Sequence, residues 1–451
     1  MMLGLAFFAL SLLLAFGNLY WLYSQNRRGS FAFNLVLLAA LFILSFHLFS
    51  ISEVYAGVFN INAFGAFFAA LLLLALLLLN ALAYAYSHEY SFFAGLSSFM
   101  LLGSFAVIFS AVVPLIFVGL ELVVLPAIFI ILLSTRRSVE AAVKYLIISA
   151  MSTAAFALAM VFMFGASGSI ALSQVASTSF SLGALALFFV ALGIESSQFP
   201  FSVVFPDVYE GSAAYATAML GGFNKVVGFA ALILVVSVVF FSLKLPSYIA
   251  AGFAVLTMFY GNLAALRQQN LKRLMAYSSI SQAGYIIIGL AANSSFGIEA
   301  MLFQLFAHSF LFIGALAVIS WLESMGRSSI DDVIGLKDEN KLATFALVLF
   351  LLSLIGMPFT TGFVGKFLLF LSAVQANLVW LAILGILNSI ISIFYYAKVI
   401  TASLTSKLNA RKQSMPIPVV LVLIACITIT LLFGIFASPI VSFAEAAATS
   451  L

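Results

Sequence analysis

Apolar stretches of about 20 residues recur along the whole of this chain, and that repetition restricts its fold more than any other feature. A stretch of this length crosses the hydrocarbon core of a bilayer as a helix. Helix is required because a lipid-embedded segment must satisfy its own backbone hydrogen bonds. A membrane barrel of strands would need short segments of alternating polarity, which the chain lacks.

The composition agrees with a membrane protein. Of 451 residues, 65% are hydrophobic and only 7% are charged, which is too little charge for a soluble domain. We therefore predict an all-α polytopic membrane protein with about fourteen transmembrane helices. The predicted spans are 2–23, 31–52, 61–86, 91–111, 113–134, 142–164, 180–204, 212–241, 247–266, 274–292, 298–321, 343–371, 376–400 and 416–443.

Several kinds of site are not expected. The first span has no basic leader and is followed by Arg27 and Arg28, so we do not expect it to be a cleaved signal. One cysteine, Cys426, and scattered histidines predict neither a disulfide nor a metal site. The chain contains no phosphate loop, dinucleotide fingerprint or HExxH motif, so no catalytic residues are proposed.

The basic residues predict an orientation. Fifteen of the 18 lysines and arginines lie in or beside odd-numbered loops between spans, whereas Lys244 alone lies in an even-numbered loop. The positive-inside rule then places odd-numbered loops in the cytoplasm and both termini outside the cell membrane. These charges act as topology signals, and the net charge of +4 does not indicate a nucleic-acid partner. The fifteen are Arg27, Arg28, Arg136, Arg137, Lys144, Arg267, Lys272, Arg273, Arg327, Lys337, Lys341, Lys398, Lys407, Arg411 and Lys412.

Five ionisable residues fall inside predicted spans: Glu121, Glu195, Lys225, His308 and Lys366. An ionisable group in a span is costly, so each is a functional candidate by default. Structural alternatives remain for all of them. The acids could be buried with one hydrogen-bonding partner and serve packing alone. The lysines could snorkel to the membrane surface, although they lie near mid-span. The histidine could be either structural or functional.

Helix breakers accompany two of these candidates. Pro200 follows Glu195 by five residues, and Pro358, Gly362 and Gly365 precede Lys366. Proline removes a backbone donor and clashes with the preceding turn. We therefore expect both spans to be interrupted within the membrane, with backbone and polar groups facing a wet cavity.

The two interruptions lie five spans apart, which suggests two inverted five-helix repeats. We expect a three-helix segment over 1–90, repeats over 91–241 and 247–400, and a C-terminal helix over 416–451. The acids of FPFSVVFPDVYEG (199–211), Asp207 and Glu210, are expected to form caps or loop contacts at an elbow outside the membrane.

Uncharged polar residues also gather within the spans. Residues 277–285 read YSSISQAGY, and Gln304 and His308 share one face of the next span. Hydroxyl, amide and imidazole groups can hold a file of water. They can equally form the interhelical hydrogen bonds that are routine in membrane bundles.

Certain stretches resemble a known family. They are GLELVVLP (119–126), PDVYEG (206–211), GNLAALRQQNLKRLMAYSSISQAGY (261–285), SIDDVIGL (329–336) and GMPFTTGFVGKF (356–367). In these stretches the chain, from about residue 90 to 400, resembles the antiporter-like, proton-translocating subunits of respiratory complex I, most closely the N-type.

The resemblance implies roles for individual residues. Glu121 would couple to a neighbouring subunit, Lys225 would be the bridging lysine of span 8, and Lys366 would be the span 12 lysine near the exit. Where the family has a span 7 lysine this chain has Glu195, and where it has a histidine this chain has Ser202. Two nearby carboxyls do not both ionise easily in a low dielectric, so Glu121 and Glu195 are expected to share a proton or to be neutralised by Lys225.

The hypotheses are therefore three. The first is a proton-translocating membrane subunit of a complex I-like quinone oxidoreductase, with flavin, iron–sulfur clusters and quinone in partner subunits and no cofactor in this chain. The second is a subunit of a cation/proton antiporter or membrane-bound hydrogenase, in which the two acids bind Na⁺. The third is a scaffold that only seals and anchors a complex. It remains open whether the first half still pumps.

Overall fold

The structure is a computed structural model that describes residues 2–24, 26–135, 138–172, 179–239, 245–407 and 411–451. Arg136, Arg137 and Lys244, which contribute to the predicted orientation, lie outside these ranges.

The α-helices are α1 (Met2–Ser24), α2 (Arg27–Leu48), α3 (Ala63–Tyr86), α4 (Tyr90–Ile108), α5 (Val113–Ser134), α6 (Val139–Ser167), α7 (Ser179–Glu195), α8 (Phe205–Gly211), α9 (Ala214–Met219), α10 (Lys225–Ile233), α11 (Leu245–Ala265), α12 (Leu271–Ala291), α13 (Ser295–Ser324), α14 (Leu336–Glu339), α15 (Lys341–Ile355), α16 (Thr361–Gln375), α17 (Val379–Leu404), α18 (Ile417–Ile435) and α19 (Ser438–Thr449). Shorter elements are the 3-10 turns η2 (Phe201–Val204) and η5 (Asp331–Val333), the π-helical segments η3 (Leu220–Asn224) and η4 (Leu234–Val239), and the strands β1 (Glu53–Tyr55) and β2 (Phe59–Ile61).

Within these ranges, 12 helices are long and apolar enough to cross a membrane. Three shorter apolar helices, Leu182–Glu195, Lys341–Ile355 and Thr361–Gln375, correspond to the two spans predicted to be interrupted. The prediction of an all-α multi-pass membrane protein is therefore confirmed. The hairpin of β1 and β2, which lies between α2 and α3, was not predicted.

Both interruptions occur where they were expected. α7 ends at Glu195, and helical structure resumes at η2, directly after Pro200. α15 ends at Ile355, where Gly356 takes a left-handed φ of 107° that favours glycine. Pro358 lies in the gap before α16.

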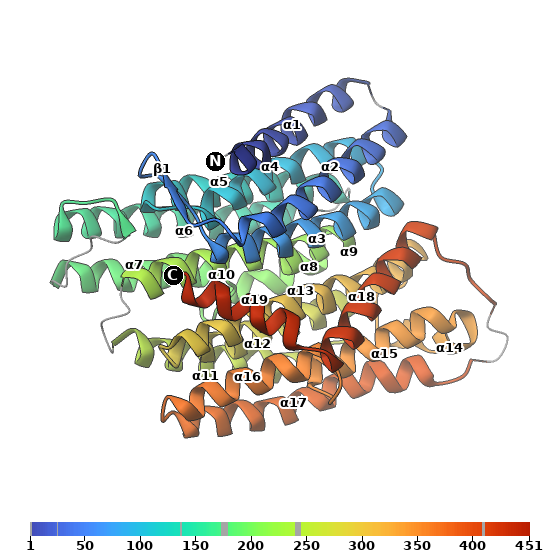
Figure 1. Ribbon diagram of the computed structural model, residues 1–451. Helices are drawn as coiled ribbons and strands as arrows, with labels where there is room; N and C mark the ends of the chain where they lie inside the picture. Colours follow the sequence, from blue (N-terminus) through green and yellow to red (C-terminus); the bar gives the residue numbers. More distant parts are fainter. Residues whose placement is uncertain (1, 25, 136–137, 173–178, 240–244, 408–410) are drawn as a thin grey trace.

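Gly362 and Gly365 lie inside α16 rather than in the gap. They allow close packing instead: a Cβ on Gly362 would lie 1.9 Å from the carbonyl oxygen of Ser353, and one on Gly365 would lie 2.0 Å from Oε1 of Gln304. These glycines let α16 approach α15 and α13 (Figure 1).

The C-terminal region differs from the prediction. The span expected over 416–443 is divided into α18 and α19. Pro439 occupies the first turn of α19, where the backbone N–H that proline lacks would have no intrahelical partner in any case. α19 packs against α3 and α13. Gly434 brings α18 against the gap before α16, because a Cβ there would lie 2.4 Å from Cα of Thr360.

The core of the bundle consists of the segment Ala214–Val236 together with α12 and α13, whose membrane windows are completely buried. Figure 1 shows the α1–α2 connection, α14 and the α17–α18 connection at one end of the bundle, with both chain termini away from it. We call this the basic end, because Arg27, Lys337 and Lys412 lie in these segments.

Candidate functional site

Lys225 is the first residue of α10, directly after the π-helical segment η3. Such bulges are frequent at functional sites. Its side chain is buried, and Nζ donates hydrogen bonds to the carbonyl oxygen of Ser279 at 2.9 Å and to its Oγ at 2.5 Å. The ammonium therefore lies on α12 inside the bundle, and this contradicts snorkelling to an end.

His308, on α13, shares the same serine. Its Nε2 lies 3.5 Å from Oγ of Ser279, and the ring packs against Phe312 at 5.4 Å between centroids. The imidazole is fully buried, and Nδ1 has no hydrogen-bond partner among the residues that the structure describes. Ser279 thus joins Lys225 to His308.

Two glutamines continue the polar contacts. Gln304 lies one helical turn before His308 on α13. Its Nε2 donates to Oε1 of Gln282 at 3.1 Å, and Nε2 of Gln282 donates to the carbonyl oxygen of Leu354 at 3.1 Å. This carbonyl belongs to the last turn of α15, beside the interruption.

Lys366 completes this series. Its buried Nζ donates to the carbonyl oxygens of Leu354 at 2.8 Å and Ile355 at 3.0 Å, and to Oγ of Ser389 at 3.3 Å. The ammonium also lies 4.4 Å from the ring centroid of Tyr285. Carbonyls at a helix C-terminus lack intrahelical donors and carry negative partial charge, so the interruption creates a cation site.

A second polar cluster lies beside Lys366. Asn262 of α11 donates to the hydroxyl of Tyr285 at 3.1 Å and to the carbonyl oxygen of Asn388 at 3.0 Å. Tyr395 in turn donates to Oδ1 of Asn262 at 2.9 Å. These bonds connect α11, α12 and α17 around the lysine.

Glu195 lies at the broken end of α7, pressed against α10. A Cβ on Gly228 would lie 2.7 Å from the carbonyl carbon and oxygen of Glu195, so only glycine permits this approach. The side chain is half-buried and lies close to Ser152 of α6 and within electrostatic range of Glu121. Whether the two acids act as a pair stays a prediction.

Glu121 lies near the rim of this site. Its side chain is half-buried on α5, and Oε1 accepts a hydrogen bond from Oγ1 of Thr153 at 2.5 Å. Val118 and Leu122, on the same side of α5, are exposed apolar residues. Glu121 is therefore at an outer face of the bundle.

Tyr145 links Glu195 to the region of Lys225. Its buried hydroxyl interacts electrostatically with Glu195 and accepts a hydrogen bond from Nδ2 of Asn224 at 3.4 Å. Asn224 directly precedes Lys225. Together these residues form one polar series, half-buried at Glu121 and Glu195 and buried from Tyr145 onwards, which we call the axis: Glu121, Glu195, Tyr145, Asn224, Lys225, Ser279, His308, Gln304, Gln282 and Lys366.

The elbow outside the axis is helical, as α8, and its acids form ion pairs. Asp207 accepts from Lys144 at 2.8 Å and from Arg273 at 2.6 Å, and Glu210 accepts from Arg273 at 2.9 Å. Partial burial acts to raise the pKa of Asp207, but the hydrogen bonds from Lys144 and Arg273 outweigh it and hold this pKa below its usual value.

Sequence reasoning missed some members of the axis. Tyr145 and Asn224 were not singled out, although Asn224 is a polar residue beside a lysine within a span. Asn262 and Asn388, in spans 9 and 13, gave a similar signal. The ionisable residues could be predicted because charged residues are rare in this chain. Their amide and hydroxyl partners could be identified only from the three-dimensional contacts.

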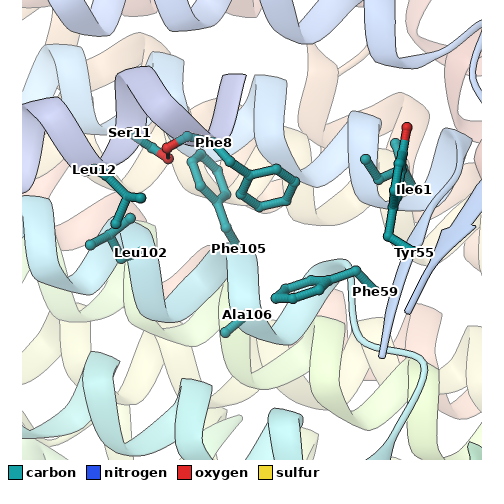
Figure 2. A pocket seen from close by; sticks show the side chains of 9 residues that line it. All are labelled: Phe8, Ser11, Leu12, Tyr55, Phe59, Ile61, Leu102, Phe105 and Ala106. Carbon is teal, nitrogen blue, oxygen red and sulfur yellow. Dashed lines mark hydrogen bonds between the residues drawn. The ribbon is translucent and has the colours of Figure 1, made fainter. Parts of the chain in front are cut away.

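An apolar hollow lies elsewhere, between α1, α4 and the β1–β2 hairpin, and has a volume of about 440 Å³ (Figure 2). Its polar groups are already engaged: Ser11 donates to the carbonyl oxygen of Phe8, and Tyr55 donates to Glu53. Apolar side chains line the rest, among them Phe59, Phe105 and Leu102. This hollow offers no chemistry comparable to that of the axis.

Comparison with known sequences identifies the family. Residues 110–392 match the family model described as NADH:quinone oxidoreductase/Mrp antiporter, transmembrane. The chain is 36% identical to "NADH-quinone oxidoreductase subunit N" of Trichlorobacter lovleyi over 74% of this chain and 72% of the relative. It is 31% identical to the protein of the same name from Desulforamulus reducens, over 99% of this chain and 96% of the relative.

Solved structures agree. A chain of respiratory complex I from Thermus thermophilus superimposes with a TM-score of 0.85 at 25% identity, covering 97% of this chain and 98% of that chain. A chain of the Mrp complex from Dietzia has a TM-score of 0.89 at 17% identity, covering 100% of this chain and 96% of that chain, which shows a shared fold alone. The chain therefore belongs to the NADH:quinone oxidoreductase/Mrp antiporter family of membrane proteins, in the branch of NADH-quinone oxidoreductase subunit N.

Proposed function

We propose that this chain is a proton-translocating membrane subunit of a complex I-like quinone oxidoreductase, and that protons move along the axis. The observation that carries the proposal is a series of buried polar groups: Lys225, Ser279 and His308 are joined by contacts, and Gln304, one helical turn from His308 on α13, is joined through Gln282 to the carbonyl bound by Lys366. Buried ionisable groups joined in this way are rare in a span unless they serve transport.

The partners of the two lysines suit a group that gains and loses a proton. Neither lysine has a carboxylate partner among the salt bridges of the described residues. The Ser279 hydroxyl can accept from the ammonium of Lys225 or donate to its neutral amine. The carbonyls beside Lys366 stabilise its charged form, which would favour delivery of a proton to that end.

The first half differs in charge. With Glu195 beside Glu121, this half would hold one shared proton rather than a lysine–glutamate pair. We propose that both halves translocate protons, and that the chain contains inverted repeats over 91–241 and 247–400 after a three-helix segment. Glu121, on an outer face of α5, would meet a neighbouring subunit.

Electron transfer would take place in other subunits, which would hold the flavin, the iron–sulfur clusters and the quinone. In the part of the chain that the structure describes, no group of His, Cys, Asp or Glu is arranged to hold a metal ion. We place the chain in the cell membrane with the basic end in the cytoplasm and both termini outside.

A tagged purification from native membranes in mild detergent tests this proposal. Co-purification of subunits that carry iron–sulfur signals, with quinone reduction, is the expected result. Isolation with only other hydrophobic antiporter subunits, and Na⁺-dependent transport, would instead favour a cation/proton antiporter. The feature that favours this second candidate is the presence of two acids, Glu121 and Glu195, within electrostatic range of each other, because they could bind Na⁺.

A further inference from the structure

We infer that Tyr209, the tyrosine of the PDVYEG segment, together with Tyr145 relays protons from a pocket at the basic end to Lys225. The inference rests on the proposed function and adds to it the place where protons enter. It gives a role to a segment whose acids alone were expected to form structural contacts.

The entrance is a polar pocket between α6 and α8, with a volume of about 230 Å³. The residues around it are Glu140, Ala141, Lys144, Asp207, Glu210 and Gly211. Four of these are charged, so the pocket holds water rather than lipid. Lys144 lines it and Arg273 pairs with two of its acids, so it lies beside two of the segments that we place at the cytoplasmic side.

Tyr209 lies on the other side of α8 from this pocket. Residues two apart in a helix point about 200° from one another, so Tyr209 faces away from Asp207. Its side chain is buried, packs against Phe312, which itself packs against His308, and lies within interaction range of the Ser279 hydroxyl. Ser279 is the residue that holds the ammonium of Lys225. One short helix therefore joins the pocket to the axis.

Tyr145 makes the same connection from α6. Lys144 lines the pocket, and the next residue, Tyr145, is buried on the inner side. The hydroxyl of Tyr145 interacts electrostatically with both Tyr209 and Glu195. Water entering between α6 and α8 thus meets two tyrosine hydroxyls before it reaches the lysine.

Unpartnered oxygens mark where that water would lie. Oγ of Ser149 and Oδ1 of Asn224 are buried without a hydrogen-bond partner among the described residues. Both residues are close to Tyr145, since Asn224 bonds to its hydroxyl and Ser149 lies one turn further along α6. Buried polar atoms of this kind are normally satisfied by ordered water.

The pocket is held in position by contacts across the elbow. Lys272 of α12 donates to the carbonyl oxygen of Ser212 at 2.6 Å and pairs with Glu323 at 2.6 Å. Oε2 of Glu323 accepts from the backbone N–H of Ala214 at 2.7 Å, which satisfies a free donor at the start of α9. α8 is thereby fixed against α12 and α13, the helices that carry Ser279 and His308.

The relay transfers one proton from the pocket to Lys225. A hydronium ion in the pocket gives its proton, through water, to the hydroxyl oxygen of Tyr145, which passes its own proton to the hydroxyl oxygen of Tyr209, and Tyr209 passes its own proton to Oγ of Ser279. The Ser279 hydroxyl passes its proton to neutral Nζ of Lys225. Each hydroxyl breaks one O–H bond and forms another, and Lys225 gains one N–H bond and one positive charge.

Tyr209→Phe tests the relay in the whole complex, reconstituted into vesicles. The substitution keeps the ring packed against Phe205 and Phe312 and removes only the hydroxyl. Tyr215→Phe is the matched control, because Tyr215 is a buried tyrosine of the next helix that packs against Phe93. Proton translocation is measured together with quinone reduction and with the yield of assembled complex.

The expected result for Tyr209→Phe is a fall of at least about tenfold in the rate of proton loading through this half. Translocation should approach the level of Lys225→Ala, while Tyr215→Phe behaves as the unmodified protein. Normal translocation in Tyr209→Phe would overturn the inference. If that variant does not assemble, Tyr145→Phe decides, and normal translocation there also overturns it. A Lys225→Ala variant that pumps normally would instead contradict the proposed function.

Discussion

The neighbours of Glu195 decide how the first half of the axis works. Glu195 shares its surroundings with Glu121, Ser152 and the hydroxyl of Tyr145, and it touches the backbone of α10 at Gly228. A carboxyl in this position can hold a proton and pass it through hydroxyls. We therefore propose that Glu195 shares a proton rather than forming a salt bridge.

We predict that Glu195→Gln abolishes coupled proton transport while the complex still assembles, because the amide keeps the shape and hydrogen bonds but no longer exchanges a proton. The measurement is acidification of vesicles per electron transferred. Glu89→Gln, at an exposed acid with no side-chain capping bond at the start of α4, is the control and should transport normally. Transport by Glu195→Gln at the control rate would exclude this role.

The ion pairs of Asp207 predict a dependence of stability on pH. Because hydrogen bonds from Lys144 and Arg273 hold the folded-state pKa of Asp207 below its unfolded value of about 3.8, the stabilisation is present above that value and is lost as pH falls through the folded pKa. Asp207→Asn should therefore lower the Tm in detergent at pH 7 (Asp207 is about a third exposed, so only modestly).

That difference in Tm should shrink as the pH is lowered towards and below about 3.8. Asp331→Asn, at an exposed aspartate of η5, is the control and should leave the Tm unchanged at every pH. A Tm difference for Asp207→Asn that stays constant with pH would show that the ion pairs are not its cause.

At the scale of residues, the sequence predicted the ionisable members of the axis because charge is so scarce in this chain. Glu121, Glu195, Lys225, His308 and Lys366 stood out for that reason. Tyrosine occurs 15 times, so nothing in the sequence distinguished Tyr145 or Tyr209 from the others. Their position depends on the way α6 and α8 turn towards α12, which is a tertiary property.

At the scale of elements, the prolines predicted where the helices are interrupted, and the glycines allow the close helix packing around the interruptions. Pro200 and Pro358 both lie in gaps between helices, as their chemistry requires. The π-helical segment before Lys225 and the division of α18 from α19 were not predicted. A π-bulge has no composition of its own, and the apolar run of 416–443 continues through the division.

We predict that Gly362→Ala destabilises the protein by about 1–3 kcal/mol or more, because its Cβ would lie 1.9 Å from the backbone oxygen of Ser353. The measurement is the Tm of the purified complex. Gly252→Ala is the control: it lies in α11, and a Cβ there meets nothing within 4 Å. That change should be neutral or stabilising by about 0.4–1 kcal/mol. Equal Tm values for the two variants would contradict the packing of α15 on α16.

At the scale of the whole molecule, the axis runs across the bundle, whereas the basic residues gather at one end of it. The axis crosses from α5 and α7, through α10, α12 and α13, to α16. A path in this direction passes sideways through the protein and reaches the basic end through the α6–α8 pocket. This arrangement suits a subunit that takes up protons from one side of the membrane and is coupled to neighbouring subunits within the membrane plane.

Orientation can be tested by labelling single cysteines in a Cys426→Ala background. Ser406→Cys lies at the basic end and is exposed, and Glu445→Cys lies on the exposed side of α19 near the C-terminus. In intact cells a membrane-impermeant thiol reagent should label Glu445→Cys but not Ser406→Cys, and permeabilised cells should show both. The reverse labelling would overturn the proposed orientation.

The central claim is that protons pass along the axis through Lys225 and Lys366. The most direct measurement is proton translocation per electron in vesicles that contain the assembled complex, compared between the unmodified protein and the Lys225→Ala and Lys366→Ala variants. Lys337→Ala, on α14 at the basic end, is the control. The account predicts that both axis variants assemble and lose coupled translocation, whereas the control keeps it. Full translocation by both axis variants would contradict the account and leave this chain as a scaffold.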